Sequence, residues 1–205
     1  MHLYEDLHSL GRSSKYKERV DTGIAVLNTQ NRRHGIKARR GDGSFGEIVP
    51  NVEPIKDKGY VVCRGPIATI EIGVEVKILM KAMIKQIDRV MNDLKGQAAH
   101  FRSRGGQPIC VGIVGINRAP YCTTYEGDRA FSTDGKKYKH PADEAQEAER
   151  RLIEQTAPEF DEFIVLRFEA TNVPPYTFAW TNENATMMDY GAALARISQQ
   201  YEARG

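Results

Sequence analysis

The sequence predicts an α/β protein in which helices flank a mixed β-sheet. Three stretches lead to this prediction. Residues 69–78 alternate between apolar and polar side chains, which is typical of a β-strand with one buried face. Residues 80–94 repeat apolar side chains every three or four positions, which is typical of an amphipathic helix. Residues 109–116 (ICVGIVGI) are almost wholly apolar and indicate a central strand that is covered on both faces.

Length and composition narrow the class of protein. The chain of 205 residues suits one domain, so we expect a single domain over 1–205, with a core at roughly 15–116 and elaborations at 117–205. The net charge is only +2, which by itself indicates no partner. The three cysteines lack metal-ligand spacing, the N-terminus is polar, and no apolar run approaches the ~18 residues of a membrane span. These features predict a cytoplasmic protein with no membrane partner.

The N-terminal part of the chain is predicted to hold one helix and a hairpin. A helix is expected over 15–31, where apolar side chains recur at three and four residues after a serine cap. Residues 60–64 and 67–79 both have the pattern of a strand, and Gly65-Pro66 breaks the chain between them. We therefore expect these two strands to form an antiparallel hairpin.

The C-terminal half is predicted to alternate helices and strands after a long polar connection at 117–140. Tyrosines and lysines are interleaved in that connection, which suits contact with nucleic acid but equally suits a surface excursion. Pro141 at a first helical position opens a helix that we expect to end near residue 155. A strand is expected over 161–170, and Asn184 is expected to cap a last helix.

The polar face of the 69–78 strand carries a candidate site. Glu71, Glu75 and Lys77 share this face, and side chains two residues apart lie about 6.6–6.8 Å from one another. A Glu-x-Lys pair on a strand is commonly only a surface ion pair. Here a second acid and a lysine-rich helix directly after the strand favour a site in which carboxylates hold a divalent cation beside a lysine.

The segment GPIATIEIGVEVK, followed by a helix and a buried strand, resembles the PD-(D/E)XK nuclease superfamily, to which many type II restriction endonucleases belong. The resemblance covers roughly 15–116 and implies a restriction-endonuclease-like mixed sheet flanked by helices. In this family the Glu and Lys of the motif lie on the third core strand, and they correspond here to Glu75 and Lys77. The family's other acid is an Asp on the neighbouring strand, often after a proline. This chain departs from that pattern, because Ile67 follows Pro66.

Two residues are candidates for the second acid. The hairpin expected around Gly65-Pro66 would place Asp57 opposite Glu75 on the adjacent strand. Glu71 shares the face of Glu75 but lies ~13 Å along a straight strand, so it would need a bulge at Gly73 to reach the same ion. We prefer Asp57 over Glu71 and keep both as candidate metal ligands.

The resemblance implies Mg²⁺-dependent hydrolysis of DNA, as an endonuclease rather than an exonuclease, with Mn²⁺ able to substitute. Glu75 and Asp57 or Glu71 would hold the metal, and Lys77 would orient the attacking water. Cleavage of both strands would favour a two-fold homodimer. The alternative is a non-catalytic nucleic-acid-binding or partner-binding module on the same fold. The family often adds an acid from its first helix, for which Glu18 is available, with Glu47 from the loop as the alternative.

Two groups of side chains are predicted to contact DNA phosphates. The first is a basic run before the predicted strands, and the second follows the Glu-x-Lys motif onto the helix. The predicted contact residues are Arg32, Arg33, Lys37, Arg39, Arg40, Lys81, Lys85 and Gln86. A solvated helix face is the simpler explanation for any one of the last three.

Overall fold

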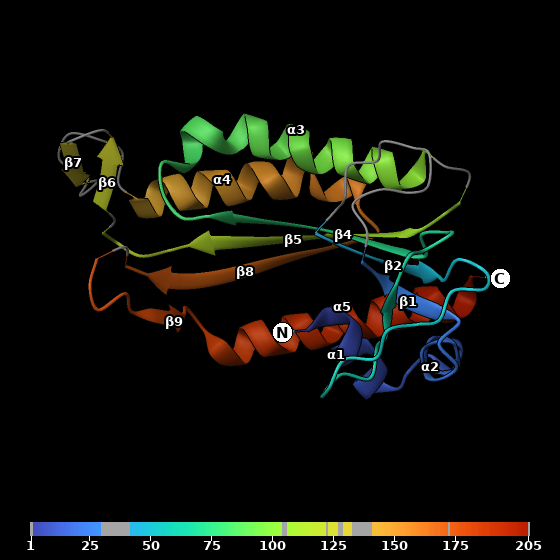
Figure 1. The fold of residues 1–205 in the computed structure, drawn as a ribbon. Coiled ribbons are helices and arrows are strands. Elements are labelled where there is room, and N and C mark those ends of the chain that lie inside the picture. The colour runs from blue at the N-terminus through green and yellow to red at the C-terminus, as the bar shows by residue number, and fades with distance from the viewer. Residues whose placement is uncertain are drawn as a thin grey trace.

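A seven-stranded mixed β-sheet lies between two layers of helices (Figure 1). The computed structural model describes residues 2–29, 42–103, 106–121, 123–126, 129–132, 141–171 and 173–204. The strand order is β3-β1-β2-β4-β5-β8-β9, and β6 and β7 form a separate two-stranded sheet. This arrangement confirms the predicted α/β class, with a mixed sheet flanked by helices.

The elements follow one another along the chain as helices, a strand-rich part and alternating helices and strands. The helices are α1 (Leu3–Leu10), α2 (Ser14–Asp21), α3 (Met83–Arg102), α4 (Pro141–Gln155) and α5 (Glu183–Ala203), with a short 3-10 helix, η1 (Ala157–Glu159). The strands are β1 (Ala25–Asn28), β2 (Gly43–Glu47), β3 (Arg64–Gly65), β4 (Ile72–Leu79), β5 (Ile109–Asn117), β6 (Thr123–Glu126), β7 (Arg129–Ser132), β8 (Glu162–Ala170) and β9 (Phe178–Trp180). Strands β4, β5 and β8 are parallel, whereas β2 runs antiparallel to both β1 and β4.

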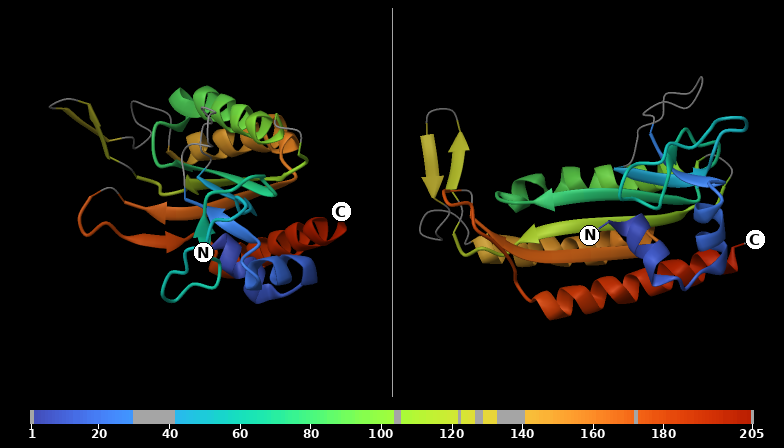
Figure 2. Two further views of the ribbon diagram at one scale, coloured as in Figure 1. Left: turned by 45° about the vertical axis from the view of Figure 1, so that its right-hand side comes forward. Right: turned by 60° about the horizontal axis from the view of Figure 1, so that its bottom comes forward.

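The two faces of the sheet have separate hydrophobic cores. Helices α3 and α4 cover one face, and α1, α2 and α5 cover the other (Figures 1 and 2). Within β4, Ile72 and Val74 pack on the α5 side, whereas Leu79 packs on the α3 side. Gly73 also faces α3, because a Cβ built there would lie 2.6 Å from the ring of Phe101. Side chains alternate along a strand, so the odd-numbered residues of β4 face α3. None of the described helices is long and apolar enough to cross a membrane.

The local predictions for α4, β5 and β8 are confirmed, but the predicted range of the first helix, 15–31, is wrong. Helix α2 ends at Asp21, and β1 begins at Ala25, inside the range predicted as helical. The cause is Gly23, which adopts a left-handed backbone conformation with φ of 68°. Glycine accepts this conformation without the steric cost that other residues meet, and it commonly ends helices.

The predicted hairpin around Gly65-Pro66 is also wrong. β3 pairs in parallel with β1, and β4 pairs with β2 through Phe45↔Ile72 and Gly43↔Val74. Asp57 therefore does not lie opposite Glu75. β2 lies beside β4 instead. Its Phe45 is fully buried, stacks on the ring of Tyr4 and packs against the tilted ring of Tyr16, which stabilises this pairing although the sequence of β2 is glycine-rich.

A β-bulge precedes β4. Phe45 pairs with Ile72, yet its carbonyl accepts a hydrogen bond from the N–H of Glu71 at 2.8 Å. Further along, Ile48 bridges to Ile67. The chain from residue 67 to 72 is thus longer than the stretch of chain that it faces, and the extra residues loop out of the ladder.

Gly46 makes room for this bulge. A Cβ at Gly46 would lie 2.0 Å from the carbonyl oxygen of Thr69, which no other residue type would tolerate. The bulge interrupts the side-chain alternation, so the Glu71 side chain turns to the α2 and α5 side while that of Glu75 faces α3. The bulge lies before Ile72 rather than at Gly73, and it separates the two glutamates instead of bringing them together.

Asn117 joins the C-terminal ends of three strands. Its Nδ2 donates to the carbonyls of Met80 and Ala170, and its Oδ1 accepts from the N–H groups of Ala119 and Ala170. The residue is 2% exposed. This fully bonded amide fixes the end of β5 against the chain that follows β4 and against β8.

Candidate functional site

Asp42, the residue directly before β2, reaches the middle of β4. Its Oδ2 accepts a hydrogen bond from the backbone N–H of Val76 at 2.7 Å. β2 begins at Gly43, opposite Val74, so β4 continues past the start of β2. The carboxylate takes the place that another strand residue would occupy. Because the N–H and C=O of one strand residue point to the same side, the Val76 carbonyl also faces the Asp42 edge.

Glu75 and Lys77 lie next to this contact, on the α3 face of β4. Lys77 Nζ donates to Glu75 Oε1 at 2.6 Å. Glu75 is only 7% exposed, and the Lys77 side chain is 28% exposed. The structure therefore brings together the predicted Glu-x-Lys pair and an aspartate from the neighbouring strand.

The electrostatics of this cluster favour an additional cation. Burial raises the pKa of Glu75, and the negative charge of Asp42 raises it further, while the hydrogen bond from Lys77 only partly offsets these effects. Burial lowers the pKa of Lys77, but Glu75, Asp42 and Asp93 outweigh it, so the net pKa of Lys77 is raised. The carboxylates of Asp42 and Glu75 therefore share the single ammonium group of Lys77. A further positive charge would stabilise these two negative charges.

The oxygen atoms at the site suit magnesium. Asp42, Glu75 and the Val76 carbonyl offer hard oxygen donors, and Mg²⁺ characteristically uses one or two carboxylates and keeps waters or phosphate oxygens as its other ligands. No cluster of three or more His, Cys, Asp or Glu side chains suited to a metal occurs within the described residues. A closed four-ligand site of the zinc type is therefore not formed there.

Asp57 lies elsewhere. It forms an ion pair with Arg64, with Arg64 Nη2 donating to Asp57 Oδ1 at 2.7 Å. Both residues line a cavity of about 580 Å³ beside the N-terminal segment, together with Tyr4 and Tyr60. Arg64 belongs to β3, which β1 and β2 separate from β4. The structure does not bring Asp57 to Glu75.

Glu71 also lies away from Glu75, on the opposite face of the sheet. Arg19 Nη2 donates to its Oε1 at 2.5 Å, and the hydroxyl of Tyr201 donates to its Oε2. These residues line a cavity of about 290 Å³ between α2 and the end of α5. Glu71 is thus satisfied by an arginine and a tyrosine that join the two helices to the sheet.

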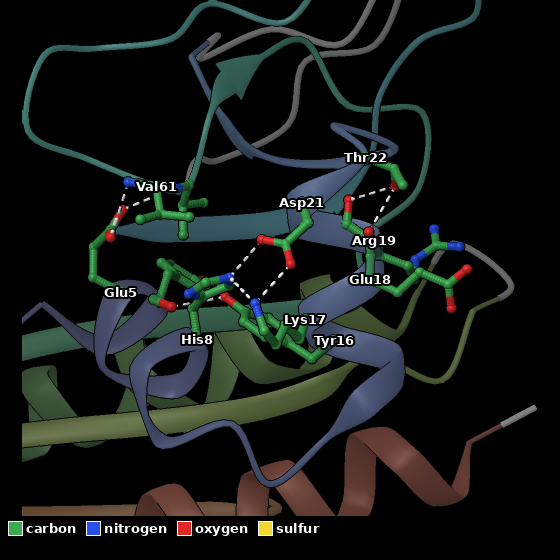
Figure 3. A network of polar contacts seen from close by, with 11 residues as sticks. Glu5, His8, Tyr16, Lys17, Glu18, Arg19, Asp21, Thr22 and Val61 are labelled. Atoms are coloured by element: carbon green, nitrogen blue, oxygen red, sulfur yellow. Dashed lines mark hydrogen bonds and ion pairs between the residues drawn. The ribbon is translucent and has the colours of Figure 1, made fainter.

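Glu18, the acid available on the predicted first helix, is exposed on α2. Figure 3 shows how α2 is fixed next to α1: Asp21 accepts from Lys17 at 2.7 Å and contacts His8 at 2.7 Å. Helix α2 packs on the α5 side of the sheet. Glu18 therefore does not join the Glu75 site on the α3 face.

The predicted DNA-contact residues fall in two places. Arg32, Arg33, Lys37, Arg39 and Arg40 lie outside the described residues. Lys85 is exposed on α3. Gln86 Nε2 donates to the carbonyl of Lys81 at 3.2 Å, which bonds the first turn of α3 to the chain that precedes it. The connection after β5 contains the β6–β7 hairpin, which projects from the end of the sheet (Figures 1 and 2).

Sequence reasoning missed Asp42 and Asp93. Asp42 stands in a Gly-Asp-Gly-Ser cluster that has the composition of a turn. The sequence signal for Asp42 is an acid that directly precedes the strand next to the Glu-x-Lys strand.

No family model, curated protein or solved structure matches this chain.

Proposed function

We propose that the protein is a metal-dependent deoxyribonuclease in which Asp42, Glu75 and Lys77 form the catalytic site. The observation that carries the proposal is the hydrogen bond between Asp42 and the N–H of Val76, which holds the acid directly before β2 beside Glu75 and Lys77 of β4. This is the distribution of acids and lysine that the PD-(D/E)XK motif requires. Asp42 takes the role for which Asp57 and Glu71 were the sequence candidates.

The order of elements supports the same family. Helix α2 is followed by the antiparallel strands β1, β2 and β4, then by α3 and by β5, which is parallel to β4. Glu75 and Lys77 thereby lie on the third strand of this unit, as in restriction-endonuclease-like folds. β3, β8 and β9 extend the sheet at its two sides.

The chain supplies metal ligands and a hydrogen-bond donor for hydrolysis. Bound Mg²⁺ supplies Lewis-acid chemistry, since it lowers the pKa of water and neutralises charge on the phosphate. The carboxylates of Asp42 and Glu75 and the carbonyl of Val76 would hold it. Lys77, whose pKa is raised, stays protonated at neutral pH. It therefore donates a hydrogen bond to the attacking water and stabilises developing negative charge, rather than acting as a base.

Cleavage of supercoiled plasmid in Mg²⁺ or Mn²⁺ tests this function. Asp42→Asn and Glu75→Gln each remove a charge while preserving size, and the amide oxygen of the new asparagine would still accept the Val76 hydrogen bond. Each is expected to lower the rate by about a hundredfold or more and to weaken Mg²⁺ binding in calorimetry. Asp57→Asn is the matched control, because that acid is paired with Arg64, and it should cleave normally.

Full activity of the Asp42→Asn variant would contradict the proposed site. If the unmodified protein binds DNA but cleaves it with neither metal, the alternative of a non-catalytic nucleic-acid-binding module is favoured instead.

A further inference from the structure

β9 covers only part of the outer edge of β8. It pairs with Phe168, Glu169 and Ala170, and its last contact is the N–H of Thr181 with the carbonyl of Arg167. Within the described chain, residues 162–166 of β8 have no strand on that side. The sheet therefore has an open edge five residues long between β9 and η1.

The backbone groups at this edge point outward. The Phe168 carbonyl accepts from Arg118 on the β5 side, whereas the Arg167 carbonyl accepts from Thr181 on the β9 side. Backbone groups alternate along a strand, so the N–H and C=O groups of Phe163 and Val165 face away from β5. Open strand edges of this kind readily pair with another strand.

The edge forms the floor of a groove of about 330 Å³ between two helical walls. Ile153 and Ala157 lie on one wall, and Asp189, Ala192 and Arg196 of α5 lie on the other. Ile153 is 46% exposed, although it is a large apolar residue. The groove thus combines an unpaired strand with an uncovered apolar side chain and small residues that permit close approach.

The charges along α5 are arranged symmetrically about the middle of the edge. Arg196 donates two hydrogen bonds of 2.8 Å to Glu162, at the start of β8. Asp189 lies two turns earlier and lines the groove together with Arg167, near the other end of the edge. Its charge acts on both Arg167 and Arg196 of its own chain. α5 therefore runs antiparallel to β8, and Ile164, the middle residue of the open 162–166 edge, lies close to the midpoint between the two charged ends. A two-fold axis at Ile164 would place the Asp189 of each copy next to the Arg196 of the other.

We propose that a second copy of this chain occupies the groove, with β8 pairing antiparallel to β8 about a two-fold axis near Ile164. Phe163 of each copy would then exchange backbone hydrogen bonds with Val165 of the other. A second copy supplies, in one register, both the unpaired strand edge and the opposite charges. This self-complementarity selects a homodimer over an unrelated extended peptide. The proposal does not depend on the nuclease function.

Molar mass measured by light scattering over a range of concentrations tests the interface. The unmodified protein is expected to form a dimer. Asp189→Arg would set arginine against Arg196, and Arg196→Glu would set glutamate against Asp189, so each variant alone is expected to be monomeric. A mixture of the two variants restores both ion pairs and is expected to form a heterodimer. Glu183→Arg, a charge reversal at the exposed start of the same helix, is the control and should remain dimeric.

Hydrogen exchange gives a second measurement that needs no variant. The amides of Phe163 and Val165 are expected to exchange more slowly as concentration rises and the dimer forms. A monomer at every concentration, or variants that remain dimeric alone, overturns the proposal. The first of these results would leave the edge open to an extended peptide of another protein. If Arg196→Glu fails to fold because Glu162 loses its partner, concentration-independent exchange of the two amides is the result that overturns it.

Discussion

The Asp42 carboxylate is bonded to the backbone N–H of Val76 at 2.7 Å, although 34 positions separate the two residues in the chain. The contact holds the carboxylate that directly precedes β2 against the middle of β4. It places two carboxylates and one ammonium within a small region next to α3, where burial raises the pKa of Glu75. Ionisable groups held together in this way, with a perturbed pKa, are found preferentially at functional sites.

Replacing Lys77 separates its chemical role from its structural one. Lys77→Ala is expected to reduce plasmid cleavage by about a hundredfold or more, because the water-orienting ammonium is lost. It also leaves the buried Glu75 without its cation, which should lower the free energy of unfolding by ~1–3 kcal/mol. Urea unfolding and cleavage assays measure the two effects. Lys56→Ala, which replaces an exposed lysine between β2 and β3, is the control. A fully active Lys77→Ala variant would rule out the mechanism.

Gly46 and Gly96 provide a matched pair for the bulge before β4. Gly46→Ala is expected to destabilise the protein by several kcal/mol, because the new Cβ would meet the Thr69 carbonyl at 2.0 Å. Gly96→Ala in α3 is expected to stabilise by ~0.5–1 kcal/mol, since no atom lies within 4 Å of its Cβ position and alanine favours helices. Thermal and urea unfolding compare the two variants. Equal stabilities would show that the bulge does not press on Gly46.

The buried carboxylate of Glu149 should make stability depend on acid pH. Burial raises its pKa, but hydrogen bonds and charges from Arg167 and Arg118 outweigh this effect, so the net pKa is lowered. A lowered folded-state pKa stabilises the fold above the unfolded value of ~4.3, and the stabilisation is lost as the pH falls through the folded value. Glu149→Gln should therefore be less stable than the unmodified protein at pH ~7, with the difference shrinking below pH ~4.

Unfolding in urea at several pH values measures this difference. Glu147→Gln is the control, because its carboxylate pairs with Arg150 on the surface of α4 and should contribute at most ~1 kcal/mol. A gap between Glu149→Gln and the unmodified protein that stays constant down to pH ~3 would contradict the lowered pKa.

The basic run before Asp42 is expected to bind DNA phosphates. Replacing Arg32, Arg33, Arg39 and Arg40 with alanine should weaken binding to every DNA sequence. The slope of log K against log salt should fall by about 0.9 for each phosphate that the protein no longer neutralises. Fluorescence anisotropy at several salt concentrations measures the slope. An unchanged slope would move the contact surface to the lysines between residues 136 and 139.

Signals contained within one stretch of sequence predicted their elements well. Pro141 marked the first residue of α4, and the unbroken apolar run of β5 marked a central strand. The two-residue spacing of Glu75 and Lys77 placed both on one face, and they form an ion pair there. In each case the determining physics is local to the residues concerned.

Features that depend on distant partners could not be predicted. The pairing of Phe45 with Ile72 follows from burial among the rings of Tyr4 and Tyr16, which the spacing of residues along β2 does not reveal. The reversal of Glu71 follows from the bulge, which needs the bare backbone of Gly46. Asp42 was hidden for the same reason, because its importance arises only when β2 lies beside β4.

The hydrogen bond between Asp42 and β4 does not depend on which side chain stands at position 76. It uses the main-chain amide of Val76, a group that every amino acid except proline possesses. Val76 can therefore be replaced by other apolar residues while the spacing between Asp42 and Glu75 is preserved. Proline is the exception, since it has no N–H to offer, and at this position it would release Asp42 from the strand.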